Sequence, residues 1–139
     1  MEKLGVKSFK YLGRHFWFTL HCIALWAPSR VPGSGIEFTD EQKRDYKDFF
    51  QNLHKVIPCG LCSNNYIEHL RALPLDQDVM KSSESLFRWT VDIHNLVNQE
   101  LGKEIWSHDK ALEHYHAIEC GKCALKGGID KSQLESYFS

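Results

Sequence analysis

The chain has 139 residues, of which 42% are apolar and 12% aromatic, and its formal net charge is -1 at pH 7. This length allows one buried core and is too short to expect two, so we predict a single domain. The near-neutral charge excludes a strongly basic surface, and we therefore expect no nucleic-acid partner and no membrane partner.

The first predicted helix runs from about Ser8 to Trp26 and ends before Pro28. Basic residues followed by an apolar run make its start look like a secretory signal, but Arg14 and His21 interrupt the run and no small-residue cleavage pattern follows it. The run is also too polar and too short to span a bilayer. We therefore predict a core helix of a soluble protein that is made inside a cell.

The second predicted helix covers about residues 38–57 and begins at Thr39 and Gln42, which have the spacing of a capping box. Pro58 interrupts the helical pattern. The side chains expected to be buried, at helical spacing, are Tyr46, Phe49, Phe50, Leu53, Val56 and Ile57.

The third predicted helix begins at the cysteine pair of "CGLC" and stops at Pro74. One side of this helix carries Cys62, Tyr66, His69, Leu70 and Leu73.

A fourth helix is predicted to begin at Ser83 as its cap and to end near Gly102. A shorter fifth helix, about Ser107 to Ile118, leads to a tail, residues 119–139, that contains a second pair, "CGKC". The apolar stripe of the fourth helix consists of Leu86, Thr90, Ile93, Val97 and Leu101. With little strand signal anywhere, the sequence predicts an all-α protein.

Polar residues interrupt two of these helices where packing alone does not ask for them. His94 and Asn98 lie one turn apart beside the apolar stripe of the fourth helix, and Arg14, Trp17 and His21 share a face of the first. Polar groups at the edge of a core need partners. One interpretation makes His21 and His94 satisfied core histidines. The other is an aromatic nucleotide with phosphates, which would use rings, amides and cations together, with Lys103 and Lys110 among the cations.

The two Cys-x-x-Cys pairs have several interpretations. Cys59 and Cys62 stand at a predicted helix start, where free backbone N–H groups and the helix dipole stabilise a thiolate, so the pair suits redox chemistry. Zinc ligation by both pairs requires two pairs 57 residues apart to meet, far more than in usual zinc ribbons. Inert staples are a third interpretation. For Cys22, apolar neighbours indicate a buried spectator thiol.

Three segments together resemble the Erv/ALR family of flavin-linked sulfhydryl oxidases: "GRHFWFTLH", "PCGLC" and "HNLVNQELGK", in the family's order, within about Gly13 to Tyr115. The resemblance implies a four-helix bundle with a short fifth helix, FAD held noncovalently, and a homodimer. It divides the chain into an FAD-binding helical domain, residues 1–118, and a tail, residues 119–139. The FAD contacts that it implies are Gly13, Arg14, Trp17, His21, His94, Asn95, Val97, Asn98, Leu101, Lys103, Lys110 and Tyr115.

The resemblance also implies the roles of the cysteines. Cys59 would be the sulfur attacked by thiols of substrate proteins and Cys62 the sulfur nearest the flavin, with electrons passing through FAD to oxygen and giving hydrogen peroxide. Cys120 and Cys123 would be a shuttle disulfide that relays electrons to Cys59, or else a local structural tie. No metal is expected.

The chain departs from the family pattern at two places. A structural disulfide of many members would join positions occupied here by Val91 and His108, and Trp26 stands where the family often has tyrosine. The missing staple makes the chain most similar to forms encoded by large DNA viruses, such as iridoviruses. The expected location is intracellular, in host cytoplasm or a viral assembly site, or otherwise in the mitochondrial intermembrane space.

A second function from another class stays open at this point. The chain would then be a noncatalytic cysteine-rich interaction module that binds zinc, and its aromatic stripes would simply be core.

Overall fold

The computed structural model describes residues 2–28 and 36–118, with side chains for residues 13–28 and 36–117. The predicted pair Cys120 and Cys123 lies outside the described residues. Within the described ranges the protein is all-α, with an isolated bridge between Glu37 and Ser82 and no named strand. The helices are α1 (Glu2–Leu25), α2 (Asp40–Asn52), α3 (Gly60–Ala72), α4 (Ser83–Glu100) and α5 (His108–Ile118), with 3-10 turns η1 (Leu53–Lys55) and η2 (Val79–Lys81).

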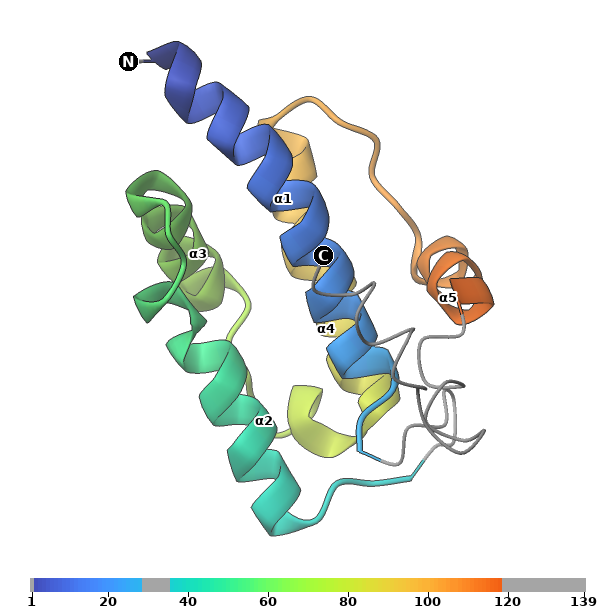
Figure 1. The fold of residues 1–139 in the computed structure, drawn as a ribbon. Coiled ribbons are helices and arrows are strands. Elements are labelled where there is room, and N and C mark those ends of the chain that lie inside the picture. The colour runs from blue at the N-terminus through green and yellow to red at the C-terminus, as the bar shows by residue number, and fades with distance from the viewer. Residues whose placement is uncertain (1, 29–35, 119–139) are drawn as a thin grey trace, which may run out of the picture.

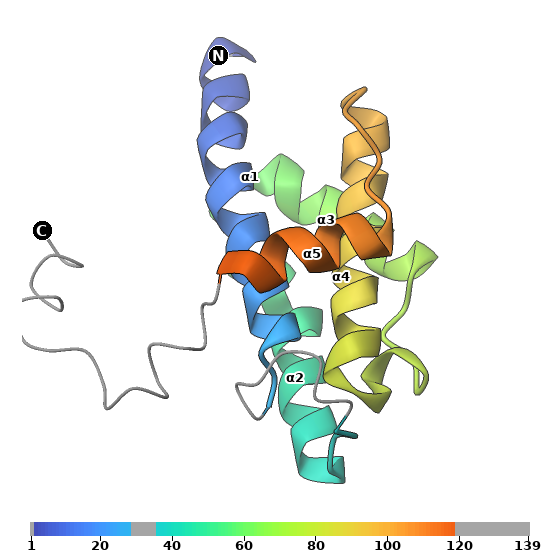
Figure 2. The ribbon, with the colours of Figure 1, turned by 90° about the vertical axis from the view of Figure 1, so that its right-hand side faces the viewer.

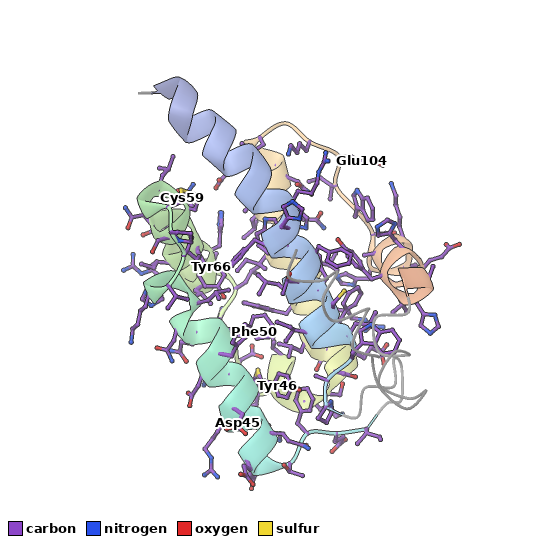
Figure 3. The ribbon with its side chains drawn as sticks, viewed as in Figure 1. Asp45, Tyr46, Phe50, Cys59, Tyr66 and Glu104 are labelled. Atoms are coloured by element: carbon purple, nitrogen blue, oxygen red, sulfur yellow. A yellow bond between two sulfur atoms is a disulfide. The ribbon has the colours of Figure 1, made fainter. Side chains whose placement is uncertain are left out.

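Helices α1 and α4 lie side by side, and α5 crosses both of them (Figures 1 and 2). On the other side, α3 contacts α4, while α2 connects to the rest through η1 and η2. The core between them includes Phe50 from α2, Tyr66 from α3, and Phe87 and Ile93 from α4, all buried. Figure 3 shows Phe50 and Tyr66 in this interior and Cys59 at the start of α3. The described part of the chain is therefore a four-helix bundle with a fifth helix laid across it.

The capping box predicted for α2 is confirmed. The Gln42 N–H donates to Thr39 Oγ1 at 3.2 Å, and the Thr39 N–H donates to the Gln42 side-chain oxygen at 2.9 Å. The predicted cap of α4 is wrong by one residue. Ser82 is the N-cap, with Ser85 as its reciprocal partner, and Ser83 is a buried first residue of the helix. Of two adjacent serines, only Ser82 has the extended backbone that a cap requires.

The predicted burial of Phe49 and Val56 is also wrong. Phe49 is 41% exposed and Val56 is 73% exposed. Phe49 is adjacent to the fully buried Phe50, and neighbours on a helix point about 100° apart, so both cannot face the core. Val56 follows the end of α2 at Asn52, where the chain tightens into η1 and the helical spacing no longer applies.

Gly102 ends α4 as predicted. Its φ of 66° is the left-handed conformation that glycine adopts without steric cost. The Lys103 N–H donates to the Asn98 carbonyl at 2.8 Å and the Gly102 N–H to the Gln99 carbonyl at 3.3 Å, which together form a Schellman motif. This motif turns the chain sharply, so that residues 101–107 return along α4 toward α5. None of the described helices is long and apolar enough to cross a membrane.

Candidate active site

A cavity of about 390 Å³ opens between α1, α4, α5 and the segment after α4. Every residue predicted to contact the cofactor lines it except Lys110, which instead pairs with Glu104 at 2.8 Å and lies over the Trp106 ring at 4.5 Å. The residues that line the cavity are Gly13, Arg14, Trp17, His21, Val91, His94, Asn95, Val97, Asn98, Leu101, Lys103, Glu104, Trp106, Ala111 and Tyr115.

Four of these residues were not predicted as site residues. Val91 lies three residues before His94 on α4, so helical spacing was a signal that could have identified it. Glu104, Trp106 and Ala111 reach the cavity because the segment after α4 folds back and because α5 lies across the bundle. Local spacing carries no signal for such contacts.

Stacked rings form the deep wall of the cavity. Trp17 lies parallel to His94, with ring centroids 4.4 Å apart and an interplanar angle of 3°. His21 lies against both, with centroids 6.0 Å from Trp17 and 5.1 Å from His94, and Tyr115 from α5 packs on His21 at 4.6 Å. The helical spacing of Trp17 and His21 on α1 thus brings them to the face that meets His94 on α4.

Hydrogen bonds fix which nitrogens of the two histidines carry protons. The Thr90 hydroxyl donates to the Phe87 carbonyl at 2.6 Å, so its oxygen accepts from His21 Nδ1–H at 2.9 Å. His21 Nε2 then accepts from His94 Nδ1–H at 2.8 Å. This assignment leaves His94 Nε2 with a free lone pair.

Burial keeps both histidines neutral. Desolvation, with smaller contributions from His94 and His114, lowers the pKa of His21 from 6.5 to about 3. Desolvation, and then the charge of Lys103, lowers the pKa of His94 from 6.5 to about 4. At neutral pH the ring wall is therefore polar and aromatic but uncharged.

The positive charges at the cavity come from Arg14 and Lys103 instead. Within the part of the chain that the structure describes, neither lies within ion-pair distance of a carboxylate, whereas Lys81, Arg71, Arg88 and Lys110 all do. Two uncompensated cations beside uncharged rings suit a ligand that carries both aromatic rings and phosphates.

Asn95 also holds the rim of the cavity. Its side-chain N–H donates to the Trp106 carbonyl at 2.8 Å, and its side-chain oxygen accepts from the Trp106 N–H at 3.0 Å. Because both ends of the amide bind the backbone of one residue, Trp106, Asn95 fixes the path of the segment after α4. Nearby, His108 Nε2 lies 2.6 Å from Asp92 Oδ1 and joins α5 to α4. This contact involves His108, one of the two positions that the family's structural disulfide would occupy.

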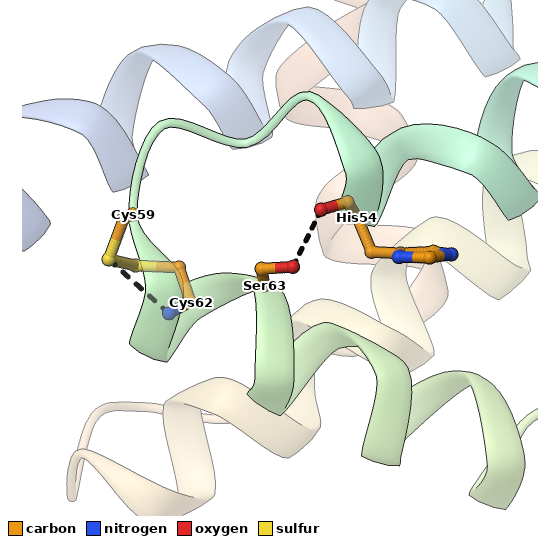
Figure 4. The surroundings of a disulfide bond; sticks show 4 residues. All are labelled: His54, Cys59, Cys62 and Ser63. Carbon is orange, nitrogen blue, oxygen red and sulfur yellow. Dashed lines mark hydrogen bonds between the residues drawn. A yellow bond between two sulfur atoms is a disulfide. The ribbon is translucent and has the colours of Figure 1, made fainter.

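Cys59 and Cys62 form a disulfide at the start of α3 (Figure 4). Cys59 is the N-cap of the helix, and its Sγ accepts from the Cys62 N–H at 3.3 Å. The helix N-terminus therefore stabilises negative charge on this sulfur when the disulfide opens. The other cysteine that the structure describes, Cys22, packs against the core and is half-buried rather than buried as predicted. Trp26 is buried and lines neither the cavity of about 390 Å³ nor a second, smaller cavity beside Cys62.

A second, mainly apolar cavity of about 50 Å³ joins the disulfide to the large one. Cys62 lines it and Cys59 does not. Gly13, Trp17 and Val97 line both cavities, so the two adjoin. This geometry distinguishes the two sulfurs, with Cys62 toward the cavities and Cys59 away from them. No cluster of metal-ligating side chains occurs among residues 13–28 and 36–117.

Comparisons with known proteins identify a family. The model of the Erv1 / Alr family matches residues 14–116. A protein of Acanthamoeba polyphaga mimivirus named "Probable FAD-linked sulfhydryl oxidase R368" is 40% identical over 101 residues, which are 73% of this chain and 66% of that protein. "FAD-linked sulfhydryl oxidase ERV1" of Arabidopsis thaliana is 30% identical over 118 residues, 84% of this chain and 56% of that protein.

The fold is similar to that of a solved structure. The crystal structure of the FAD binding domain of Erv1 from Saccharomyces cerevisiae matches with a TM-score of 0.65 and 27% identity, covering 77% of this chain and 92% of that one. The chain spans about two thirds of the length of the mimivirus protein and just over half of the length of the Arabidopsis protein.

Proposed function

The chain belongs to the Erv1/Alr family, and from this premise we propose that it is an FAD-dependent sulfhydryl oxidase that makes disulfide bonds in substrate proteins. One observation carries the proposal: a disulfide at a helix start has one sulfur, Cys62, on the wall of a cavity that adjoins a cleft of stacked rings and cations. A cofactor in that cleft can reach Cys62, while a substrate can reach Cys59 from outside.

The residues present fit FAD. Trp17 and His94 line the cleft with aromatic rings, and His94 Nε2 can accept a hydrogen bond. Arg14 and Lys103 supply cations for the diphosphate, and the buried Asn98 supplies an amide for polar ring edges. Bound FAD supplies the two-electron chemistry that connects the enzyme dithiol to oxygen, with hydrogen peroxide as the product.

The thiol steps belong to the cysteines of the chain. A substrate thiolate attacks Cys59, a mixed disulfide forms, and the Cys59–Cys62 bond breaks with Cys62 leaving as a thiolate. A second substrate thiolate then attacks the substrate sulfur of the mixed disulfide. The substrate leaves as a disulfide, and Cys59 and Cys62 are both left reduced. Their electron pair can then leave through Cys62, the sulfur on the cavity wall.

The zinc-binding alternative is less well supported than the oxidase. Zinc ligation requires thiolates at both Cys59 and Cys62, whereas the geometry joins these sulfurs to each other. The disulfide is the state in which an oxidase awaits its substrate.

The remaining features of the proposal are oxygen as acceptor, a homodimer, and Cys120 with Cys123 as a shuttle disulfide. The family resemblance supports all three. Relatives from mimivirus, and from yeast mitochondria, support either a viral assembly site or the intermembrane space as the place of action.

The direct test of the activity is oxygen consumption by the purified protein with a small dithiol. We expect consumption that depends on the dithiol, with hydrogen peroxide formed in equal amount. A protein that consumes no oxygen with any thiol, although it contains FAD, would contradict the proposal.

A further inference from the structure

The two most exposed large apolar side chains among those described stand on either side of Cys59. Val56 is 73% exposed and Leu61 is 68% exposed, and Pro58 between them is exposed too. A single exposed apolar residue is ordinary on a protein surface. These two, however, frame the sulfur at which a substrate thiol has to arrive.

Hydrogen bonds fix the conformation of residues 53–63, so that Val56 points to solvent. The Val56 N–H and the Ile57 N–H both donate to the Leu53 carbonyl, at 3.1 and 3.2 Å. Ser63 Oγ donates to the His54 carbonyl at 2.6 Å, which ties η1 to α3 beside the disulfide (Figure 4). Ile57 packs against the core, so its neighbour Val56 faces solvent.

The same stretch is poor in charge. From Leu53 to Ile67, Lys55 is the only Lys, Arg, Asp or Glu, and the nearest carboxylates in the sequence are Asp48 and Glu68. A partner that binds this stretch meets apolar side chains and one cation, Lys55, which favours the approach of a thiolate and gives a charged peptide a single ion-pairing group.

We propose that Val56 and Leu61 form a docking rim for an extended polypeptide whose cysteine is next to an apolar residue. This inference rests on the proposed function, because the mixed disulfide fixes the substrate cysteine at Cys59. Residues of an extended chain are about 3.3 Å apart, so the neighbours of that cysteine fall over side chains close to Cys59. Burial of apolar surface on both partners then stabilises the encounter.

The chemistry of the step is unchanged by the rim. The substrate thiol loses its proton to solvent, its sulfur bonds to Cys59 Sγ, and the Cys59–Cys62 bond breaks with the electron pair leaving on Cys62. The rim selects which cysteines reach Cys59, and so it names the substrate class: cysteines exposed in unfolded or extended segments with apolar neighbours.

The test uses the holoenzyme and two reduced peptides that differ only in the residue next to each cysteine, leucine in one and serine in the other. We expect kcat/KM for the leucine peptide to be about tenfold higher, mainly through KM. Val56→Ser should reduce this preference to about twofold and leave oxidation of dithiothreitol unchanged. The matched control, Ile36→Ser, removes an equally apolar side chain that is 52% exposed just before α2, and should keep the preference.

Leu61 lies between the two cysteines, so Leu61→Ser can change the reactivity of the disulfide toward every thiol. Its effect is therefore measured as the ratio of the peptide rate to the dithiothreitol rate. Equal rates on the two peptides, or a preference that survives Val56→Ser combined with Leu61→Ser, would overturn the inference. So would loss of the preference on replacing Cys120 and Cys123 by serine, because the segment 119–139 would then be what receives the peptide. In each of these results the small dithiol is still oxidised, whereas a protein that oxidises no thiol contradicts the proposed function itself.

Discussion

The ring wall and the cysteine end of the protein are built in opposite ways. Trp17, His21 and His94 are fixed by ring stacking and by a chain of hydrogen bonds that runs from His94 through His21 and Thr90 to the Phe87 carbonyl. Cys59 and Cys62 stand at a helix start beside an exposed loop that is tied to α3 at Ser63. Holding a cofactor requires groups that are ordered before it binds, whereas thiol exchange requires a sulfur that partners can reach. The two regions meet through the small cavity at Cys62.

The largest expected effect is a loss of turnover at the cysteine end that leaves cofactor binding at the ring wall unchanged. Cys62→Ser should lower dithiol oxidation by roughly a thousandfold or more, because the electron pair then has no sulfur on the cavity wall. The ring wall is untouched, so flavin content should stay at the wild-type level. Steady-state rates measure the loss of oxidation, and the absorbance ratio of flavin to protein measures the flavin content. Turnover at the wild-type rate would remove Cys62 from the mechanism.

The next largest effect concerns access to Cys59. If Cys120 and Cys123 relay electrons, replacing both by serine should lower the rate on a reduced protein by about tenfold or more and leave the rate on a small dithiol largely intact. Parallel assays on the two substrates measure this. A local structural tie predicts instead that the reduced protein is oxidised equally fast with and without the pair.

A smaller effect is expected at the ring wall. His94→Ala removes the ring stacked on Trp17, and Asn98→Ala removes a buried amide, so each should weaken flavin retention by about tenfold. Because a ligand that binds only the folded state stabilises it, the melting temperature should fall by a few degrees at the same time. His116→Ala, at an exposed position on α5, is the matched control. A His94 variant that melts lower but keeps full flavin content would make His94 a core histidine only.

The ring wall also predicts a pH dependence of stability. The pKa values of His21 and His94 are about 3 and about 4 in the folded protein, against 6.5 when unfolded. Above pH 6.5 the two histidine rings are neutral in both the folded and the unfolded protein. Below it the unfolded chain takes up protons that the folded protein does not, so stability falls as the pH drops toward 4.

The size of this loss is on the order of 2 kcal/mol per histidine at pH 5. Urea unfolding at pH 7 and pH 5 measures it. His94→Gln should reduce the difference between the two pH values, and His116→Ala should not. A pH difference that is the same in all three proteins would mean that the two rings take up protons without unfolding.

Helical spacing is what made the ring wall predictable from the sequence. Residues three, four or seven apart on one helix share a face, so Arg14, Trp17 and His21 could be placed together without knowing their partner. The capping box at Thr39 and the glycine after α4 were equally local signals.

Contacts made by irregular segments could not be predicted in this way. Glu104 and Trp106 reach the cavity because Asn95 binds the backbone N–H and carbonyl of Trp106, eleven residues ahead of it, and Lys110 turns away because Glu104 pairs with it. Ser82 and not Ser83 is the cap of α4, and Val56 is exposed and not buried. In both cases the backbone conformation distinguishes neighbouring residues that have similar propensities. The apolar rim beside Cys59 follows from that same break in the helix.

The central claim is that the cleft of rings and cations holds FAD next to a redox-active disulfide. The visible absorption spectrum of the purified protein, recorded before and after an anaerobic dithiol and accompanied by a zinc assay, tests it most directly. We predict a yellow protein whose flavin is released on denaturation, and whose flavin absorption is bleached by the dithiol in the wild type but not in Cys62→Ser. A colourless protein that holds stoichiometric zinc would contradict the account.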